Sequence, residues 1–179
     1  PLVSRHVRHP DVLRAEELLI DAFSEVEPLE VYAEDVNIGV GQGSRNVVAE
    51  LPGTGEGLPW VVVSAHYDST ALLDAGYDPA SDPAPGADDD ASGVAVVLET
   101  ARRLGAWEAG FAHPIRFVAY TGEELGLYGS TQQVEGVDDR DETLRIVVQL
   151  DPVGYNPGGS DTLWVVYRAP WDDEASELV

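Results

Sequence analysis

The chain has 179 residues, 44% of them hydrophobic and 24% charged, which is enough apolar material for one globular domain with its own core. Its 33 acidic residues outweigh ten basic ones, all Arg, giving a formal net charge of -23 that repels nucleic acid and anionic membranes, so we expect neither as a partner. No apolar run is long enough to cross a bilayer, and the absence of Cys excludes disulfides and thiolate metal ligands.

The predicted elements alternate between helices and strands. An amphipathic helix is expected over residues 11–26, and its apolar face is predicted to consist of Leu13, Leu18, Leu19, Ala22 and Phe23. Strands follow at 29–36, 46–51 and 60–65, and the sequence GTGEG predicts a hairpin turn between the last two. Beyond a long polar loop (68–87), the pattern predicts a helix at 91–104, a strand at 115–120, a helix from about Leu125, and strands at 145–150 and 162–167. Apolar strands alternating with helices indicate an α/β fold whose sheet is at least partly parallel.

Polar residues follow three of these strands directly. His66 and Asp68 come after the strand at 60–65, the pair Glu123 and Glu124 after the strand at 115–120, and Asp151 after the strand at 145–150. Open α/β sheets bind ligands beyond the carboxyl ends of their strands, so these side chains should meet at one edge. One imidazole and several carboxylates form a ligand set suited to Zn²⁺ or a similar divalent ion.

The stretch APGADDDASG places Asp88, Asp89 and Asp90 side by side before a helix. Three adjacent like charges repel one another, and a bound dication at the same edge would neutralise them. Each motif also has a structural interpretation: one aspartate can cap the helix, the others can favour its dipole, and an acid before a strand-end turn can be merely local. The conjunction of all the motifs at successive strand ends favours the metal site, and Asp68 is then suited to orienting the His66 imidazole. The remaining histidines, His6, His9 and His113, are expected at the surface.

In this order, AHYDS, APGADDDASG and TGEELGLYGS resemble the zinc aminopeptidases of family M28, over roughly residues 44–151. The resemblance implies a three-layer fold with a mixed, largely parallel sheet flanked by helices. It also implies a zinc-dependent exopeptidase that acts on the N-terminal bond of peptides. We expect a secreted or extracellular protein rather than a cytoplasmic one.

Carried onto this chain, the resemblance assigns a role to each site residue. Asp89 would bridge two zinc ions, His66 and Asp151 would complete the ligands of one ion, and Glu124 would bind the other. Glu123 would be the general base for the water that the metals activate. A cis peptide is also expected directly after the bridging residue, between Asp89 and Asp90.

One expected ligand is missing. The family's second zinc takes a further His from a downstream loop, whereas this chain has no His after His113. We therefore expect residues 1–179 to form a single M28-like domain, incomplete on its C-terminal side. The missing ligand would come from an absent C-terminal segment or a partner chain, and these residues alone would show weak or no dinuclear catalysis. The alternatives are a non-catalytic member of the fold, a glutaminyl cyclase with one zinc, and a salt-adapted acidic domain whose aspartates are solvated.

Overall fold

The computed structural model describes residues 2–41 and 44–155, and within them the predicted order of elements is confirmed. The predicted strand at 162–167 lies outside the described residues. The elements are α1 (Asp11–Ser24), β1 (Glu30–Asp35), β2 (Arg45–Leu51), β3 (Trp60–His66), α2 (Ala91–Gly105), β4 (Ile115–Tyr120), α3 (Tyr128–Asp139) and β5 (Leu144–Gln149).

The strands form one mixed sheet in the order β1-β2-β4-β3-β5. Strands β3, β4 and β5 run parallel, whereas β1 and β2 pair antiparallel with their neighbours. The predicted hairpin between β2 and β3 is therefore wrong, because β4 lies between these two strands. The GTGEG segment instead bonds to the loop that leads into β4: the Thr54 and Gly55 N–H groups donate to the carbonyls of Phe111 and Ala112.

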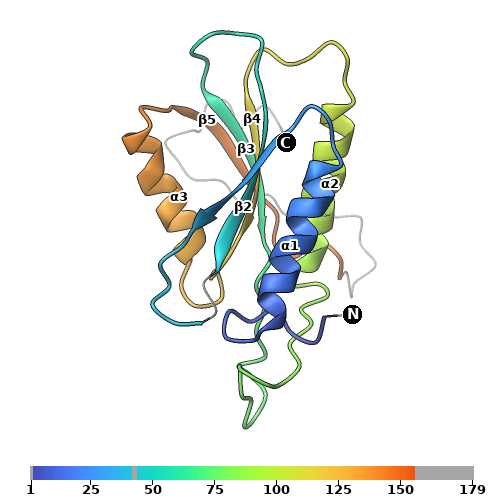
Figure 1. Ribbon diagram of the computed structural model, residues 1–179, viewed down its shortest axis with the longest axis vertical. Coiled ribbons are helices and arrows are strands. Elements are labelled where there is room, and N and C mark those ends of the chain that lie inside the picture. The colour runs from blue at the N-terminus through green and yellow to red at the C-terminus, as the bar shows by residue number, and fades with distance from the viewer. Residues whose placement is uncertain (1, 42–43, 156–179) are drawn as a thin grey trace.

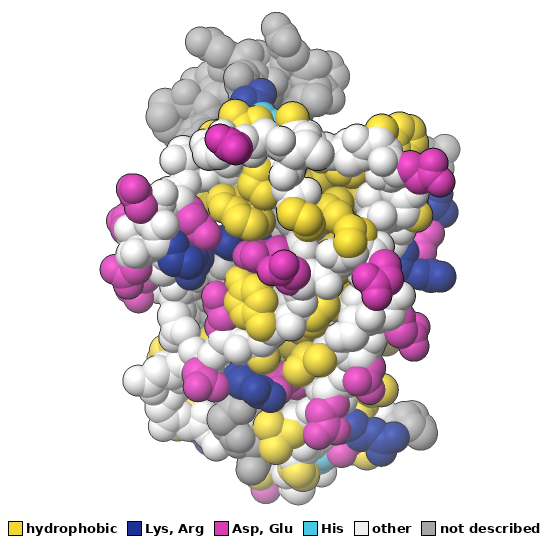
Figure 2. Space-filling model, turned by 45° about the horizontal axis from the view of Figure 1, so that its top comes forward, with side chains coloured by type: hydrophobic (Ala, Val, Ile, Leu, Met, Phe, Trp, Pro, Cys, Tyr) yellow, Lys and Arg dark blue, Asp and Glu magenta, His cyan; other side chains and the backbone are white. Residues whose placement is uncertain are grey.

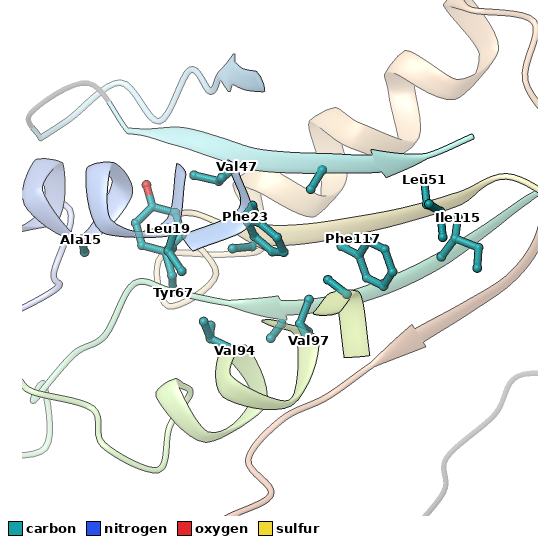
Figure 3. Packing of buried hydrophobic residues seen from close by; sticks show 14 of the residues in the cluster. Ala15, Leu19, Phe23, Val47, Leu51, Tyr67, Val94, Val97, Ile115 and Phe117 are labelled. Carbon is teal, nitrogen blue, oxygen red and sulfur yellow. The ribbon is translucent and has the colours of Figure 1, made fainter. Parts of the chain in front are cut away.

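Helices cover both faces of the sheet, so the fold is a three-layer α/β arrangement, as expected (Figure 1). Helices α1 and α2 lie on one face and α3 lies on the other. The main core fills the space between the sheet and the first two helices, and Phe23, Phe117 and Val97 meet there (Figure 3). Full burial of side chains of this size stabilises the fold by about 1.5–3 kcal/mol each.

The predicted apolar face is confirmed for α2 but is only partly correct for α1. Val94, Val97 and Ala101 of α2 are buried against the sheet. In α1, however, Leu13 and Leu18 are exposed. The buried side of α1 consists of Val12, Ala15, Glu16, Leu19 and Phe23. Both stripes of α1 carry apolar residues at helical spacing, so periodicity alone did not identify which one faces the sheet.

Strand β5 lies at the edge of the sheet and is exposed along most of its length. Its Ile146, Val147 and Val148 are exposed, and beside them the α3 face of the sheet has a smaller core of Val48, Val62, Val118 and Tyr120. Acidic side chains are spread around patches of hydrophobic side chains on the face shown in Figure 2. Among the described residues, no helix has the length and apolarity needed to cross a membrane.

The N-terminal segment is part of the folded domain, which corrects the prediction that His6 and His9 lie at the surface. His6 and His9 are 2% and 8% exposed. Each accepts a backbone N–H through Nδ1, from Arg8 and Asp11 respectively, and so closes a local turn before α1. His113 is half-buried, and its Nδ1 lies 2.8 Å from the carbonyl oxygen of Pro59.

Candidate metal centre

The carboxyl ends of the three parallel strands bring the predicted residues together. His66 is the last residue of β3, Glu123 lies just beyond β4, and Asp151 lies just beyond β5. Asp89 joins them from the turn before α2. We call these four residues the His66 cluster. Its three acids surround the Nε2 atom of His66. Nε2 lies 3.0 Å from Asp89 Oδ1, 3.7 Å from Asp151 Oδ1 and 3.9 Å from Glu123 Oε2.

The opposite nitrogen of the imidazole fixes its orientation. His66 is 1% exposed, and its Nδ1 lies 3.1 Å from the backbone carbonyl of Asp68. A neutral imidazole that donates from Nδ1 presents the Nε2 lone pair to the acids. The Asp68 carboxylate is 3.6 Å from Nδ1, so the carbonyl makes the closer contact. The expected orienting role of Asp68 therefore involves its backbone as well as its side chain.

The Asp68 side chain has a second task that the sequence did not indicate. It is fully buried, and its two oxygens accept the backbone N–H groups of Glu123 (3.1 Å) and Glu124 (3.3 Å). This carboxylate therefore attaches the turn after β4 to the end of β3. The two strand ends keep their relative positions because one buried anion binds both.

The three consecutive aspartates have three different roles. Asp88 accepts the N–H of Gly154 at 2.8 Å and so attaches the chain beyond β5 to the start of α2. The Asp89 side chain is 58% exposed and faces His66. Asp90 is fully buried and caps α2. The peptide bond between Asp89 and Asp90 is cis, as expected.

Asp90 is a competitor to Asp89 as a metal ligand. An imidazole nitrogen of His66 and one carboxylate oxygen each of Asp90 and Asp151 lie within 4.8 Å of one another. However, Oδ1 of Asp90 accepts the N–H of Gly93 and Oδ2 accepts the N–H of His66. Both oxygens are thus engaged with the backbone, whereas Asp89 Oδ1 faces the Nε2 atom of His66 at 3.0 Å. We therefore assign Asp89 to the cluster and Asp90 to the helix cap.

Burial and neighbouring charges together shift several pKa values in this region. Burial lowers the pKa of His66, but its hydrogen bond and the charges of Asp68 and Glu123 outweigh burial and raise the pKa to about 9. Burial, followed by the charges of Asp89 and Asp68, raises the pKa of Glu124 to about 7. Burial also raises the pKa of Glu123, opposed by His66 and assisted by Asp151. The imidazole of His66 therefore holds its proton more tightly than a free histidine, and the two glutamates hold theirs more tightly than free carboxyl groups.

The donor set fits divalent zinc. An imidazole nitrogen with its other nitrogen hydrogen-bonded, facing carboxylate oxygens, is the arrangement in which histidine binds zinc. A dication among these oxygens would offset the mutual repulsion of the carboxylates. His66, Asp89 and Asp151 are suited to hold one ion. Glu124 follows Glu123 in the turn after β4, and the charge of Asp89 is one of the causes, after burial, that raise its pKa.

The chain belongs to peptidase family M28, because the family model matches residues 46–178. Leucine aminopeptidase 1 of Ajellomyces capsulatus is 38% identical over 120 residues, covering 65% of this chain and 30% of that protein. A probable zinc metalloprotease of Pyricularia oryzae is 39% identical over 113 residues, covering 63% of this chain and 22% of that protein. The chain therefore spans less than a third of the length of these curated relatives.

Solved structures support the same fold. LapB of Legionella pneumophila superposes with a TM-score of 0.73 at 27% identity, over 89% of this chain and 42% of that one. A glutaminyl cyclase of Bacteroides thetaiotaomicron bound to N-acetylhistamine has a TM-score of 0.65 at 22% identity, over 84% of this chain and 57% of that one. At this low identity the second likeness shows the shared fold alone.

Proposed function

We propose that this chain carries the zinc-binding core of an exopeptidase that removes N-terminal residues from peptides. The observation that carries the proposal is the His66 cluster itself: Nε2 of a buried imidazole faces the carboxylates of Asp89 and Asp151, with Glu123 beside them. Membership of family M28 and the leucine aminopeptidase names among the relatives support peptides with an N-terminal Leu as the first substrates to test.

Zinc held by these residues would polarise the scissile carbonyl and lower the pKa of water. His66, Asp89 and Asp151 would hold the first ion. Asp89 and Glu124 would contribute to the second, with its remaining ligand supplied from beyond the residues described. His66 is kept in the orientation needed for binding because its Nδ1 is engaged by Asp68.

Glu123 is suited to act as the general base. Its side chain is 27% exposed, so substrate and water can reach it, and its Oε2 stays 3.9 Å from His66 Nε2. Burial and neighbouring acids raise its pKa above that of an ordinary carboxylate, which improves its ability to accept a proton near neutral pH. Glu123 would take the proton of the attacking water and deliver it to the amine that leaves when the C–N bond breaks.

The test combines zinc content with activity in the same preparation. Zinc bound by the wild-type chain is measured by elemental analysis, and hydrolysis is measured with a leucyl anilide and its N-acetylated analogue. An aminopeptidase should cleave the free-amine substrate and spare the acetylated one. Release of ammonia from an N-terminal Gln peptide would favour the cyclase alternative. Failure of the wild-type chain to bind zinc would overturn the proposal.

A further inference from the structure

A buried arginine from the N-terminal segment connects the end of β3, where His66 lies, with the turn that carries Asp89. Arg5 is 8% exposed and precedes α1 by six residues. Its Nε donates to the carbonyl of Tyr67 at 2.6 Å, next to His66. Its two terminal nitrogens donate to the carbonyls of Pro85 and Gly86, the latter at 2.9 Å. One guanidinium therefore bridges the end of β3 and the turn before α2.

The backbone around Arg5 strengthens this connection. The N–H of Arg5 donates to Ser69 Oγ at 3.1 Å, and Ser69 Oγ in turn donates to the carbonyl of Ala84 at 2.5 Å. Ser4 forms a parallel bridge with Ala84. Ser4, Ser69 and Ala84 are all buried. The N-terminal segment thus pairs with the chain at Ala84 like a short parallel strand, and the Arg5 side chain extends from this segment to the carbonyls named above.

Gly86 shows how closely the guanidinium fits. Its φ is +51°, and a Cβ at this position would lie 2.9 Å from the terminal nitrogen of Arg5 and 2.3 Å from the carbonyl oxygen of Asp89. The turn that carries Asp89 is therefore in direct contact with the Arg5 guanidinium. A side chain other than hydrogen at position 86 would displace one or the other.

Chain connectivity alone does not hold these loops in place. Between Ser69 and Ala84 the chain runs through a loop without helix or strand, so the ends of that loop can separate at little cost unless tertiary contacts join them. The carboxylate of Asp90, which accepts the N–H of His66, supplies one such contact. Arg5 supplies three more, to the carbonyls of Tyr67, Pro85 and Gly86. The acids also act on the guanidinium: burial lowers the pKa of Arg5, and the charges of Asp68, Asp90 and Asp89 oppose that effect.

We propose that Arg5 is a positioning residue of the metal centre, fixing the separation of His66 and Asp89 by binding the carbonyls of Tyr67, Pro85 and Gly86. The inference rests on the proposed zinc site. Arg5 lies outside the segment matched by the family model, residues 46–178. The proposal gives the N-terminal segment a role in metal affinity. A segment that served only stability would have no such role.

The test compares R5K with two control variants of the whole chain. Lysine keeps the positive charge but is a single ammonium that does not reproduce the planar fork of donors, so R5K separates charge from geometry. The exposed Arg14 on α1 gives R14K as a surface control. Val12 of α1, fully buried in the main core, gives V12A as a control for a general loss of stability. Zinc affinity is measured by competition with a chromophoric chelator, and the ligand geometry by the absorption spectrum of bound Co²⁺.

We expect R5K to weaken zinc binding by about 10–100-fold and to alter the Co²⁺ spectrum, as the loss of groups that orient metal ligands generally does. V12A and R14K should keep both wild-type properties, although V12A unfolds at lower denaturant concentration. Equal zinc affinities and Co²⁺ spectra for R5K and wild type would overturn the inference, and so would a loss in V12A equal to that in R5K. If R5K does not unfold cooperatively, S69A is measured in its place, and unchanged zinc affinity in S69A would overturn the inference. Absence of zinc binding by the wild-type chain would instead overturn the proposed function.

Discussion

The buried carboxylate of Asp68 accepts the backbone N–H of Glu123 at 3.1 Å across 55 residues of sequence. It accepts the N–H of the adjacent Glu124 as well, while its own backbone carbonyl holds His66 Nδ1. One residue therefore orients the imidazole and attaches the two glutamates to it. In the proposed metal centre, Asp68 would position the ligands without binding a metal itself.

Replacing Asp68 by Asn should weaken zinc binding by about 10–100-fold, because an amide accepts only through one of its two terminal atoms and cannot serve both N–H groups. The measurement is zinc affinity by chelator competition, together with urea unfolding of the zinc-free protein. D74N is the matched control, since Asp74 lies exposed in the loop between β3 and α2 and the change in charge is the same. Equal losses in both variants would mean that only the overall charge matters.

The adjacent glutamates should respond differently to the same substitution. E123Q should bind zinc like the wild type and lose about 10²–10⁴-fold in kcat, the usual contribution of a general base. E124Q should bind one zinc ion fewer than the wild type and lose activity with it, because its carboxylate is assigned to the second ion, whereas the ligands of the first ion are unchanged. Zinc content and kcat are measured on both proteins. If E123Q lost its zinc while E124Q kept it, the two assignments would have to be exchanged.

The neighbouring aspartates Asp89 and Asp90 should separate binding from stability. D89A should bind zinc weakly but unfold at wild-type denaturant concentration when zinc is absent, because its side chain is 58% exposed. D90A removes the cap of α2 and should lower the free energy of unfolding by about 0.5–2 kcal/mol. Denaturant unfolding with and without zinc measures both quantities. Wild-type stability in D90A would contradict the capping role.

The zinc-free protein should lose stability as the pH rises from about 4.5 to 9. A group whose pKa is raised by folding favours the folded state while it is protonated, and that advantage is lost as pH passes from its unfolded to its folded pKa. For Glu124 this window runs from 4.5 to about 7, and for His66 from 6.5 to about 9. Unfolding free energies of chelator-treated protein across this range provide the measurement. E124Q should reduce the loss between pH 4.5 and 7, to which Glu123 and Asp90 also contribute, and leave the part above it unchanged.

Zinc binding should have the opposite pH dependence. The ligands must lose their protons to bind a metal, so apparent zinc affinity should rise over the same interval. Competition titrations at several pH values test this, with ionic strength held constant because the protein is strongly acidic. An affinity that is independent of pH would show that these groups are already deprotonated in the folded protein.

Much of the fold and most of the candidate site were predictable from local sequence signals. Strand lengths, the apolar face of α2 and the polar residues after β3, β4 and β5 are encoded by the residues of each segment. Because parallel strands end at one edge, these signals also predicted that His66, Glu123 and Asp151 meet. The hairpin assigned to GTGEG was wrong because strand order depends on pairing with β4, which follows only after α2 in the chain.

Local sequence signals establish which residue types stand at each strand end, since periodicity and strand-end position are properties of short segments. The contacts that each of them makes depend on the tertiary structure. It distinguishes Asp89 from Asp90, because the backbone N–H groups of His66 and Gly93 occupy one carboxylate and leave the other free. It also brings Arg5 to the carbonyls of Tyr67, Pro85 and Gly86, beside the candidate metal centre, from a segment whose composition indicated only surface. Both outcomes depend on hydrogen bonds between residues far apart in the chain, and such partners leave no periodic trace in sequence.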